Sequence, residues 1–325
     1  MRTGVCSIDG RGRPSEDRSF IQDVSGEFLI AGVFDGHSGS FTVDFTIKIF
    51  PAKLAELVRT VGNNEAALRA GLHRIFIEHD KLLAQQGALY YKDSGTTATV
   101  AIITETHCYI AYIGDSPAFV FNPDTGSVIS AIGKHNPDRK DECSRIEKNK
   151  GFVSTEEGDA PRVDGCLMVS RAFGDFSLKF TNPRVPEFNK DWAKDFRVIA
   201  DPEILVIPRP ERGCLLISSD GLVDTLEGTF RTANEISAEI FGLSPGFTGD
   251  LNLVAKQLID NQVKLFEPDT PALYDADDIT IVLVDLTKVA QKGGVPFTRK
   301  MRRKRRANTK RTQGSASQLP KTFMI

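Results

Sequence analysis

Short apolar runs, each about the length of a β-strand, recur along the chain and limit the folds that it can adopt. They are rich in β-branched residues and are bounded by Gly, Pro, Asn and Asp, as strands usually are. Two pairs of runs are separated only by residues 105–107 and 122–126, and this spacing predicts β-hairpins and therefore antiparallel sheet. The predicted strands are 28–34, 98–104, 108–113, 117–122, 127–132, 166–170, 198–207, 214–218 and 279–286.

Longer segments between these runs have the spacing of amphipathic helices. In residues 41–60, and again after Asn63-Asn64, apolar side chains recur at helical spacing, so each helix can bury one face on a sheet. Asn63-Asn64 is the expected cap of the second helix. Shorter helices are predicted over 140–150, with Gly151 as the stop signal, and over 251–266. Helices grouped between hairpins favour an α+β domain on antiparallel sheets over an alternating βαβ fold.

Composition and targeting signals narrow the class of protein. Of the 325 residues, 40% are hydrophobic and 26% are charged, which is ordinary for a soluble globular chain. The first twenty residues lack the apolar segment of a signal peptide, and no run approaches the roughly 20 apolar residues that span a bilayer. Five separated cysteines without a C-x-x-C pair predict reduced thiols. We expect a cytoplasmic or nuclear protein that is not secreted and has no membrane span.

Charge is distributed unevenly along the chain. Residues 289–325 carry 11 Lys and Arg and no acid, whereas residues 1–288 carry 30 Lys and Arg against 43 Asp and Glu. We predict one folded domain over 1–288 and a basic C-terminal tail over 289–325 that is disordered when unbound. The basic run 299–311 fits a nuclear import signal or contact with an anionic partner, and equally a solvated tail without a specific partner.

Acidic residues stand at the ends of several predicted strands. The positions are Asp35, Asp115, Asp220 with Asp224, and Asp277-Asp278. Each one alone is weak evidence, because Asp-Gly is a common turn and Asp often bonds to nearby backbone groups. If these carboxylates meet at one sheet edge, they repel one another and need a cation to stay ionised at neutral pH. Oxygen ligands without a competing His/Cys cluster favour Mg²⁺ or Mn²⁺.

Six segments resemble, in order, the motifs of the metal-dependent, type 2C serine/threonine protein phosphatases. They are V-F-D-G-H-S-G-S, S-G-T-T-A, Y-I-G-D-S, R-V-D-G-C-L-M-V-S-R-A-F-G-D, L-I-S-S-D-G-L-V-D and D-D-I-T-I-V-L-V-D. The likeness runs from about residue 3 to 287, and six motifs in sequence are specific where any one is weak. The resemblance implies an αββα sandwich, in which two antiparallel β-sheets are flanked by helix pairs, with two metals in the cleft between the sheets.

The resemblance also implies a set of Mg²⁺ or Mn²⁺ ligands. By this resemblance, Asp35 would bridge both metals, Gly36 would offer its backbone carbonyl to one of them, and Asp220 and Asp277 would ligate the other. Glycine at position 36 would let the backbone approach closely. The remaining implied residues are Glu16 and Asp17, which reach the metals directly or through water, and Asp115, which with Asp220, Asp224 and Thr97 resembles a weaker third-metal site.

The implied reaction is direct hydrolysis of phosphoserine and phosphothreonine by a water that bridges the two metals. His37 resembles the general acid that protonates the leaving oxygen, although a lone histidine after a turn is more often a packed or solvated ring. The family's phosphate-binding arginine falls on Gly12 here. We assign its role to Arg13, with Arg11 as the other phosphate-binding candidate.

Other positions also depart from the family pattern without removing an expected metal ligand. Pro117 stands where arginine is usual, Val223 where tryptophan is frequent and Asp278 where asparagine is common, and Lys134 begins a rearranged D-H-K-P element. We therefore expect an active enzyme on phosphoprotein substrates, with a monomer as the default state. The rival hypothesis is a catalytically weak scaffold of the same fold that binds phosphoproteins or another partner.

Overall fold

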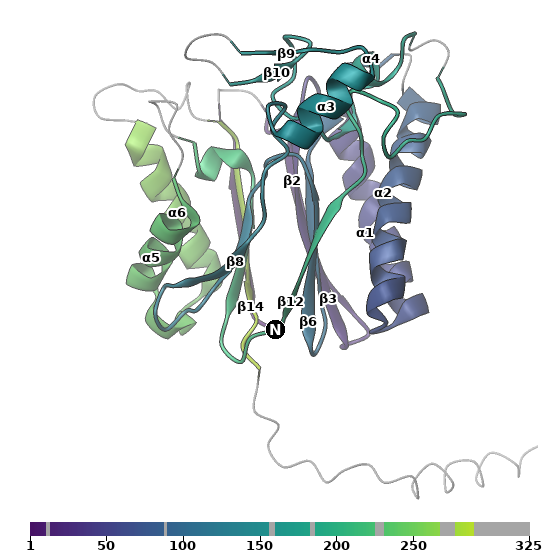
Figure 1. Ribbon diagram of the computed structural model, residues 1–325. Coiled ribbons are helices and arrows are strands. Elements are labelled where there is room, and N and C mark those ends of the chain that lie inside the picture. The colour runs from purple at the N-terminus through teal and green to yellow at the C-terminus, as the bar shows by residue number, and fades with distance from the viewer. Residues whose placement is uncertain are drawn as a thin grey trace, which may run out of the picture. The chain divides into compact units, whose positions relative to one another are not determined.

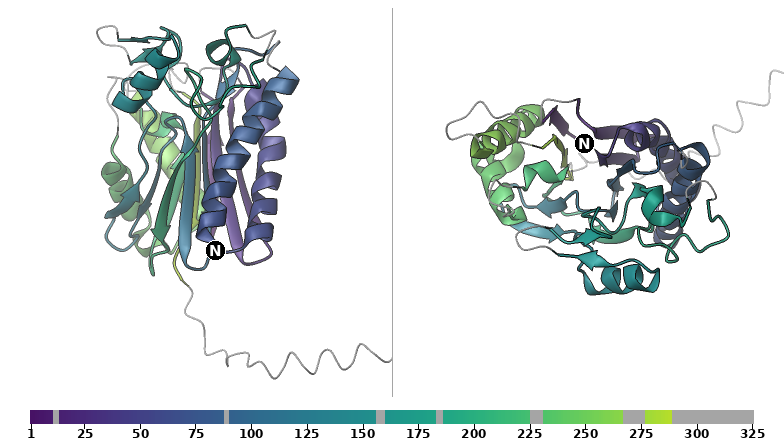
Figure 2. Two further views of the ribbon diagram at one scale, coloured as in Figure 1. Left: turned by 45° about the vertical axis from the view of Figure 1, so that its right-hand side comes forward. Right: turned by 90° about the horizontal axis from the view of Figure 1, so that it is seen from above.

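Two antiparallel β-sheets pack face to face, and a pair of helices covers the outer face of each (Figure 1). The computed structural model describes residues 1–10, 14–87, 90–155, 160–182, 186–224, 231–266 and 277–288. Seen from above, the two helix pairs lie on opposite sides with the sheets between them (Figure 2). The predicted α+β class and αββα sandwich are confirmed.

The larger sheet contains seven strands in the described part of the chain. Their order is β11-β4-β3-β5-β6-β12, and β2 pairs with β3. The bounds are β2 (Asp17–Val24), β3 (Phe28–His37), β4 (Gly95–Thr96), β5 (Ala98–Ile103), β6 (His107–Ile113), β11 (Phe173–Gly174) and β12 (Glu203–Pro208). The hairpin expected around residues 105–107 is β5–β6, with Ala98 opposite Ile113.

The smaller sheet contains five strands among the described residues, in the order β1-β14-β13-β7-β8. Their bounds are β1 (Thr3–Ile8), β7 (Ala118–Phe121), β8 (Val128–Ala131), β13 (Cys214–Ser218) and β14 (Ile279–Asp285). The second predicted hairpin is β7–β8. A separate two-stranded ribbon joins β9 (Val153–Ser154) to β10 (Arg162–Val163).

Successive side chains along the strands point to opposite faces of the sheets, and this produces three apolar layers. In β3, Leu29 and Val33 face the other sheet, whereas Ile30 and Phe34 face the helices. In β14, Val282 belongs to the layer between the sheets, and its neighbours along the strand belong to the outer layer. Successive strand residues point to opposite faces, so each sheet needs apolar partners on both sides. The continuous apolar runs in the sequence reflect this burial on both faces.

The helices supply the outer layers. The helices α1 (Phe41–Val61) and α2 (Glu65–Gly87) pack on the larger sheet, and α5 (Ala233–Leu243) and α6 (Leu251–Phe266) pack on the smaller one. The expected cap at the start of α2 is present, since the Ala67 N–H donates to Asn64 Oδ1 at 3.0 Å. The short helices α3 (Lys140–Lys148) and α4 (Phe176–Lys179) both lie at one end of the sandwich (Figure 1).

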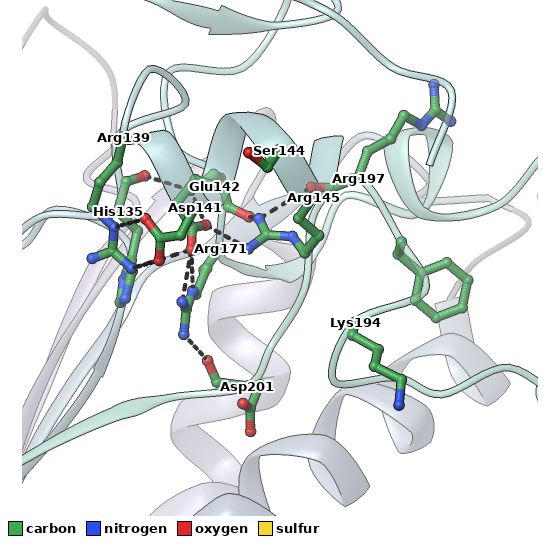
Figure 3. A network of polar contacts seen from close by, with 12 residues as sticks. His135, Arg139, Asp141, Glu142, Ser144, Arg145, Arg171, Lys194, Arg197 and Asp201 are labelled. Atoms are coloured by element: carbon green, nitrogen blue, oxygen red, sulfur yellow. Dashed lines mark hydrogen bonds and ion pairs between the residues drawn. The ribbon is translucent and has the colours of Figure 1, made fainter. Parts of the chain in front are cut away.

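Three arginines converge on Glu142, a buried residue of α3 (Figure 3). The Glu142 carboxylate pairs with Arg171 at 2.6 Å, Arg145 at 2.7 Å and Arg139 at 3.2 Å. Burial opposes ionisation, but these cations outweigh it and lower the pKa of Glu142 to about 2. The network joins α3 to the segment that leads into β11.

The structure corrects several predicted elements. Residues 166–170 form no strand, because Leu167 makes only an isolated bridge to Val163, and the strand expected from 198 begins at Glu203. The helix over 140–150 ends at Lys148. Lys150, not Gly151, takes the left-handed conformation with φ 65°, while the Gly151 N–H donates to the Ile146 carbonyl at 3.0 Å. Strands β1, β2, β4 and β11, the ribbon, α4 and α5 were not predicted.

The segment Met1–Lys288 clusters as one compact unit. The basic run 299–311 and the rest of the predicted tail lie outside the described residues, so the tail stays a prediction. Within the described ranges, none of the helices combines the length and apolarity that a bilayer crossing requires.

A buried ion pair links α2 to α4 and provides a test of the packing. Lys179 Nζ lies 2.5 Å from Asp80 Oδ2, both side chains are almost fully buried, and Asp80 Oδ1 also accepts the Gly174 N–H at 2.9 Å. We expect Lys179→Met to lower the free energy of unfolding by about 3–5 kcal/mol, because it leaves the carboxylate buried without its cation. Urea denaturation measures this loss.

The matched control is the double variant Asp80→Asn/Lys179→Met. It removes both charges but retains an acceptor for the Gly174 N–H, so it is expected to recover at least half of the lost stability. If the single and double variants lose the same free energy of unfolding, the uncompensated charge of Asp80 is not the cause of the loss.

Candidate active site

The predicted site residues gather at the end of the sandwich where β3 stops. Asp35 lies near the end of β3, directly opposite Asp17 of β2. The Asp220 N–H, at the start of the 3₁₀ turn η1 (Asp220–Leu222), donates to Asp35 Oδ2 at 3.4 Å. Residues from both sheets therefore meet around one carboxylate.

Burial and mutual repulsion perturb these carboxylates. Burial raises the pKa of Asp35 well above its usual range, and the charges on Asp220, Asp17, Asp115 and Asp277 raise it further. Burial also raises the pKa of Asp17 to about 7. Asp17 Oδ1 is buried and has no hydrogen-bond partner among the described residues. Acids held together in this way are a poor arrangement for folding alone and a good one for a bound cation.

A second acidic group lies beside the first. Burial, followed by the charge on Asp220, raises the pKa of Asp224 to about 7, and burial raises the pKa of Asp115. The ammonium of Lys134 opposes both increases. The backbone next to Lys134 is held by a hydrogen bond, since the His135 N–H donates to the Gly114 carbonyl at 3.0 Å. The Lys134 charge thus offsets part of the repulsion among the residues expected at the weaker third site.

Two hydrogen-bonded contacts hold the sheets together at this end. Ser219 Oγ, just after β13, donates to Asp17 Oδ2 of β2 at 2.6 Å. Asp278, just before β14, accepts the Gly10 N–H at 2.7 Å and the Glu16 N–H at 2.9 Å. Asn at position 278 could offer only one carbonyl oxygen, whereas the carboxylate accepts both bonds. Asp278 thus fastens both ends of the segment that carries Arg11 and Arg13, which themselves lie outside the described residues.

Two glycines allow close backbone approaches within the site. A Cβ added to Gly36 would lie 2.6 Å from the Glu16 carbonyl oxygen, and one added to Gly221 would lie 2.3 Å from the Asp278 carbonyl oxygen. Larger residues would push apart the strands that carry the acids. The geometry is compatible with a role for the Gly36 carbonyl as a ligand, which stays a prediction.

His37 forms a pair with Asp175. Its Nε2 lies 2.9 Å and 3.0 Å from the two carboxylate oxygens, and the histidine side chain is 24% exposed. Burial disfavours the imidazolium, but the Asp175 carboxylate outweighs it and raises the pKa of His37. Among the described residues, the hydrogen bonds of the His37 ring are those of Nε2 with Asp175, and none involves Nδ1.

Gly95 of β4 makes room for this pair. It stands opposite His37 in the sheet, and a Cβ at this position would lie 2.2 Å from Asp175 Oδ2 and 2.3 Å from His37 Nε2. Only a glycine therefore fits beside the contact between imidazole and carboxylate.

A closed metal site is not formed by these side chains. Within the described ranges, no three His, Cys, Asp or Glu side chains are arranged to hold an ion. The acids are nevertheless close enough to shift each other's pKa, and the Oδ1 atoms of Asp17 and Asp224 are buried without hydrogen-bond partners among the described residues. These oxygen donors fit a hard dication once side chains rotate towards it.

Comparison with known proteins identifies the family. The model of the family "Protein phosphatase 2C" matches residues 1–233. The chain belongs to the protein phosphatase 2C family. It is 31% identical over 280 residues to "Probable protein phosphatase 2C 3" of Paramecium tetraurelia, covering 82% of this chain and 85% of that protein. It is 32% identical over 226 residues to "Probable protein phosphatase 2C 55" of Oryza sativa, covering 67% of this chain and 58% of that protein.

A solved structure agrees with this assignment at the level of the fold. A phosphatase from Toxoplasma gondii superposes with a TM-score of 0.69 at 21% identity, covering 86% of this chain and 91% of that chain. The protein phosphatase 2C match contains the first five motifs. The sixth motif, which contains Asp277 and Asp278, lies beyond the matched residues. The charge on Asp277 nevertheless acts on Asp35, so this motif belongs to the same site.

Sequence reasoning missed several supporting residues of this protein phosphatase 2C site. Asp175 stood at the end of a quoted motif but received no role. The Thr97 hydroxyl, considered for the third metal, also accepts the Asp35 N–H at 3.1 Å and lies 2.6 Å from Ser116 Oγ. Ser219 had no distinguishing signal beyond its place beside Asp220.

The raised carboxyl pKa values predict that, in the absence of metal, the folded protein loses stability as the pH rises. An acid that holds its proton more tightly in the folded protein destabilises that state once it must ionise. In EDTA, we expect the free energy of unfolding to fall between about pH 4 and pH 7, by on the order of 1–3 kcal/mol at neutral pH. Urea titrations at a series of pH values measure this slope.

Asp17→Asn is the matched variant, because it removes one of the acids whose pKa is raised to about 7. It is expected to flatten the slope, and excess Mn²⁺ is expected to restore stability to the wild-type protein at pH 7.5. Metal-free stability that rises steadily with pH through this interval would contradict the prediction.

Proposed function

We propose that this protein is an Mg²⁺- or Mn²⁺-dependent phosphatase that removes phosphate from phosphoserine and phosphothreonine in proteins. Family membership supports a serine/threonine protein phosphatase. The observation that carries the finer proposal is the burial of Asp35 among acids from both sheets, with His37 two residues further on. Such an arrangement suits a dianionic phosphate only if cations lie between the acids and the substrate.

Two cations would be held by Asp35, the Gly36 carbonyl, Asp220 and Asp277, with Glu16 and Asp17 contributing directly or through water. Asp115, Asp220 and Asp224 would form the weaker third site, where the Lys134 charge already offsets part of the repulsion. When bound, the two metals would supply an activated bridging water and offset the charge on the phosphoryl oxygens.

The chain's own proton donor is His37. Asp175 engages Nε2 and favours the imidazolium, so Nδ1 carries the proton that can pass to the departing seryl or threonyl oxygen. Alkoxides are poor leaving groups, so this proton lowers the barrier for the natural substrates. Arg13, with Arg11 as the other candidate, would bind the phosphate, and both belong to the segment whose two ends are bonded to Asp278.

A catalytically weak scaffold is the less favoured alternative. It would not need the cluster of mutually repelling acids, which destabilises the metal-free fold. The sequence retains the expected metal ligands Asp35, Asp220 and Asp277, and His37 has Asp175 as a carboxylate partner.

Phosphate release from a phosphothreonine peptide tests the enzyme. We expect activity with Mn²⁺, loss of activity with EDTA, and a loss of at least about 100-fold in kcat for Asp35→Asn, because the ligand proposed to bridge both metals is weakened. Asp260→Asn is the matched control, since Asp260 forms an exposed pair with Lys256 on α6. Wild-type protein as inactive as Asp35→Asn would overturn the proposal.

Leaving-group dependence tests the role of Asp175. We expect Asp175→Asn to lower kcat for the phosphothreonine peptide by about 10–100-fold, because the imidazolium loses its supporting charge. With p-nitrophenyl phosphate the loss should stay below about threefold, because nitrophenolate leaves without protonation. Equal losses on both substrates would show that Asp175 only maintains the fold.

A further inference from the structure

An open groove lies beside His37 and has no role in the chemistry described so far. Its volume is about 400 Å³, and it is lined by residues 38–41 at the start of α1 and by Tyr90, Tyr91, Asp93 and Ser94. Residues 90–94, before β4, thus form one wall, and residues 38–41, after β3, form the other.

Hydrogen bonds connect the residues that line this groove to the partner of His37, the proposed proton donor. Ser94 Oγ donates to the Gly39 carbonyl at 2.7 Å, and the Ser94 carbonyl accepts the Asp175 N–H at 3.0 Å. Gly95, the next residue, stands opposite His37. A peptide whose phosphorylated side chain reaches His37 therefore has its neighbouring residues next to the groove.

The groove presents aromatic rings to solvent. Tyr91 stacks on Phe41 with ring centroids 4.0 Å apart and an interplanar angle of 7°. The fold leaves space for this stack, because a Cβ at Gly87 would lie 2.2 Å from Phe41 Cε1. Tyr91 nevertheless remains 48% exposed and Tyr90 81% exposed. Exposed rings of this kind contribute little to the fold and offer flat faces to a ligand.

Charge indicates which ligand fits those faces. The Asp93 side chain is 59% exposed, and its hydrogen bond to Lys92 lowers its pKa, so it is ionised at neutral pH. An exposed ion pair of this kind contributes little and can exchange partners. Residues 1–288 also carry 43 Asp and Glu against 30 Lys and Arg. A planar cation that stacks on tyrosine and pairs with a carboxylate matches both features.

We propose that the groove binds an arginine side chain close in sequence to the phosphorylated residue of the substrate, so that the enzyme prefers basic phosphopeptides. This inference rests on the proposed phosphatase function, because that function places the phosphorylated residue beside His37. Tyr90 supplies the most accessible ring, the Tyr91–Phe41 stack supplies the floor, and Asp93 supplies the opposite charge.

The test uses phosphothreonine peptides that carry a single arginine at each position from three residues before to three residues after the phosphothreonine, with an all-alanine reference. We expect at least one arginine position to raise kcat/KM about fivefold, chiefly through KM. Tyr90→Ala should remove most of this preference and Tyr90→Phe should retain it, since the ring face is conserved. Both variants should hydrolyse p-nitrophenyl phosphate like the wild type.

Binding is measured separately from turnover, with phosphonate analogues of the best arginine peptide and of the alanine reference in isothermal titration calorimetry. A ratio of Kd values that Tyr90→Ala abolishes supports the groove even if no peptide is hydrolysed, in which case the phosphatase proposal alone fails. An arginine preference that survives Tyr90→Ala, no preference at any position, or a preference for apolar residues instead would overturn the inference.

Discussion

Repulsion among buried carboxylates is the constraint on which the rest of this structure depends. Asp35 lies where charges from β2, η1 and the entrance to β14 converge, and each of these acids raises the cost of ionising it. A chain selected only for stability would avoid this arrangement. The remaining features of this end of the molecule either hold the acids in place or supply opposite charge.

The sandwich holds the acids by joining its two sheets at this end. Ser219 and Asp278 connect residues of the smaller sheet to Asp17, Gly10 and Glu16. Arginines gathered on Glu142 join α3 to Arg139 on one side and to Arg171, four residues before Asp175, on the other. The apolar layers make these supports rigid, so the acids cannot relax apart without disturbing packed side chains.

Sequence patterns could predict the parts of this molecule that depend on local periodicity. The strand over 28–34 was predictable because both of its faces are buried, and the acids were predictable because they stand at strand ends. β1 and β2 were missed because they lie at sheet edges and contain few apolar residues, so neither forms a continuous apolar run or a regular alternation. α5 carried a readable signal in its Thr232–Glu235 capping box, which went unused. The His37–Asp175 pair joins residues 138 positions apart, so no local pattern encodes it.

Gly95 shows how a site of this kind can fail without losing any reactive group. One additional methyl at this position would occupy the space where imidazole and carboxylate meet. A natural allele with alanine there would retain every acid, both members of the pair and an intact sheet, and would still separate the histidine from its partner. Surveys of variation that score only the reactive side chains would classify such an allele as benign.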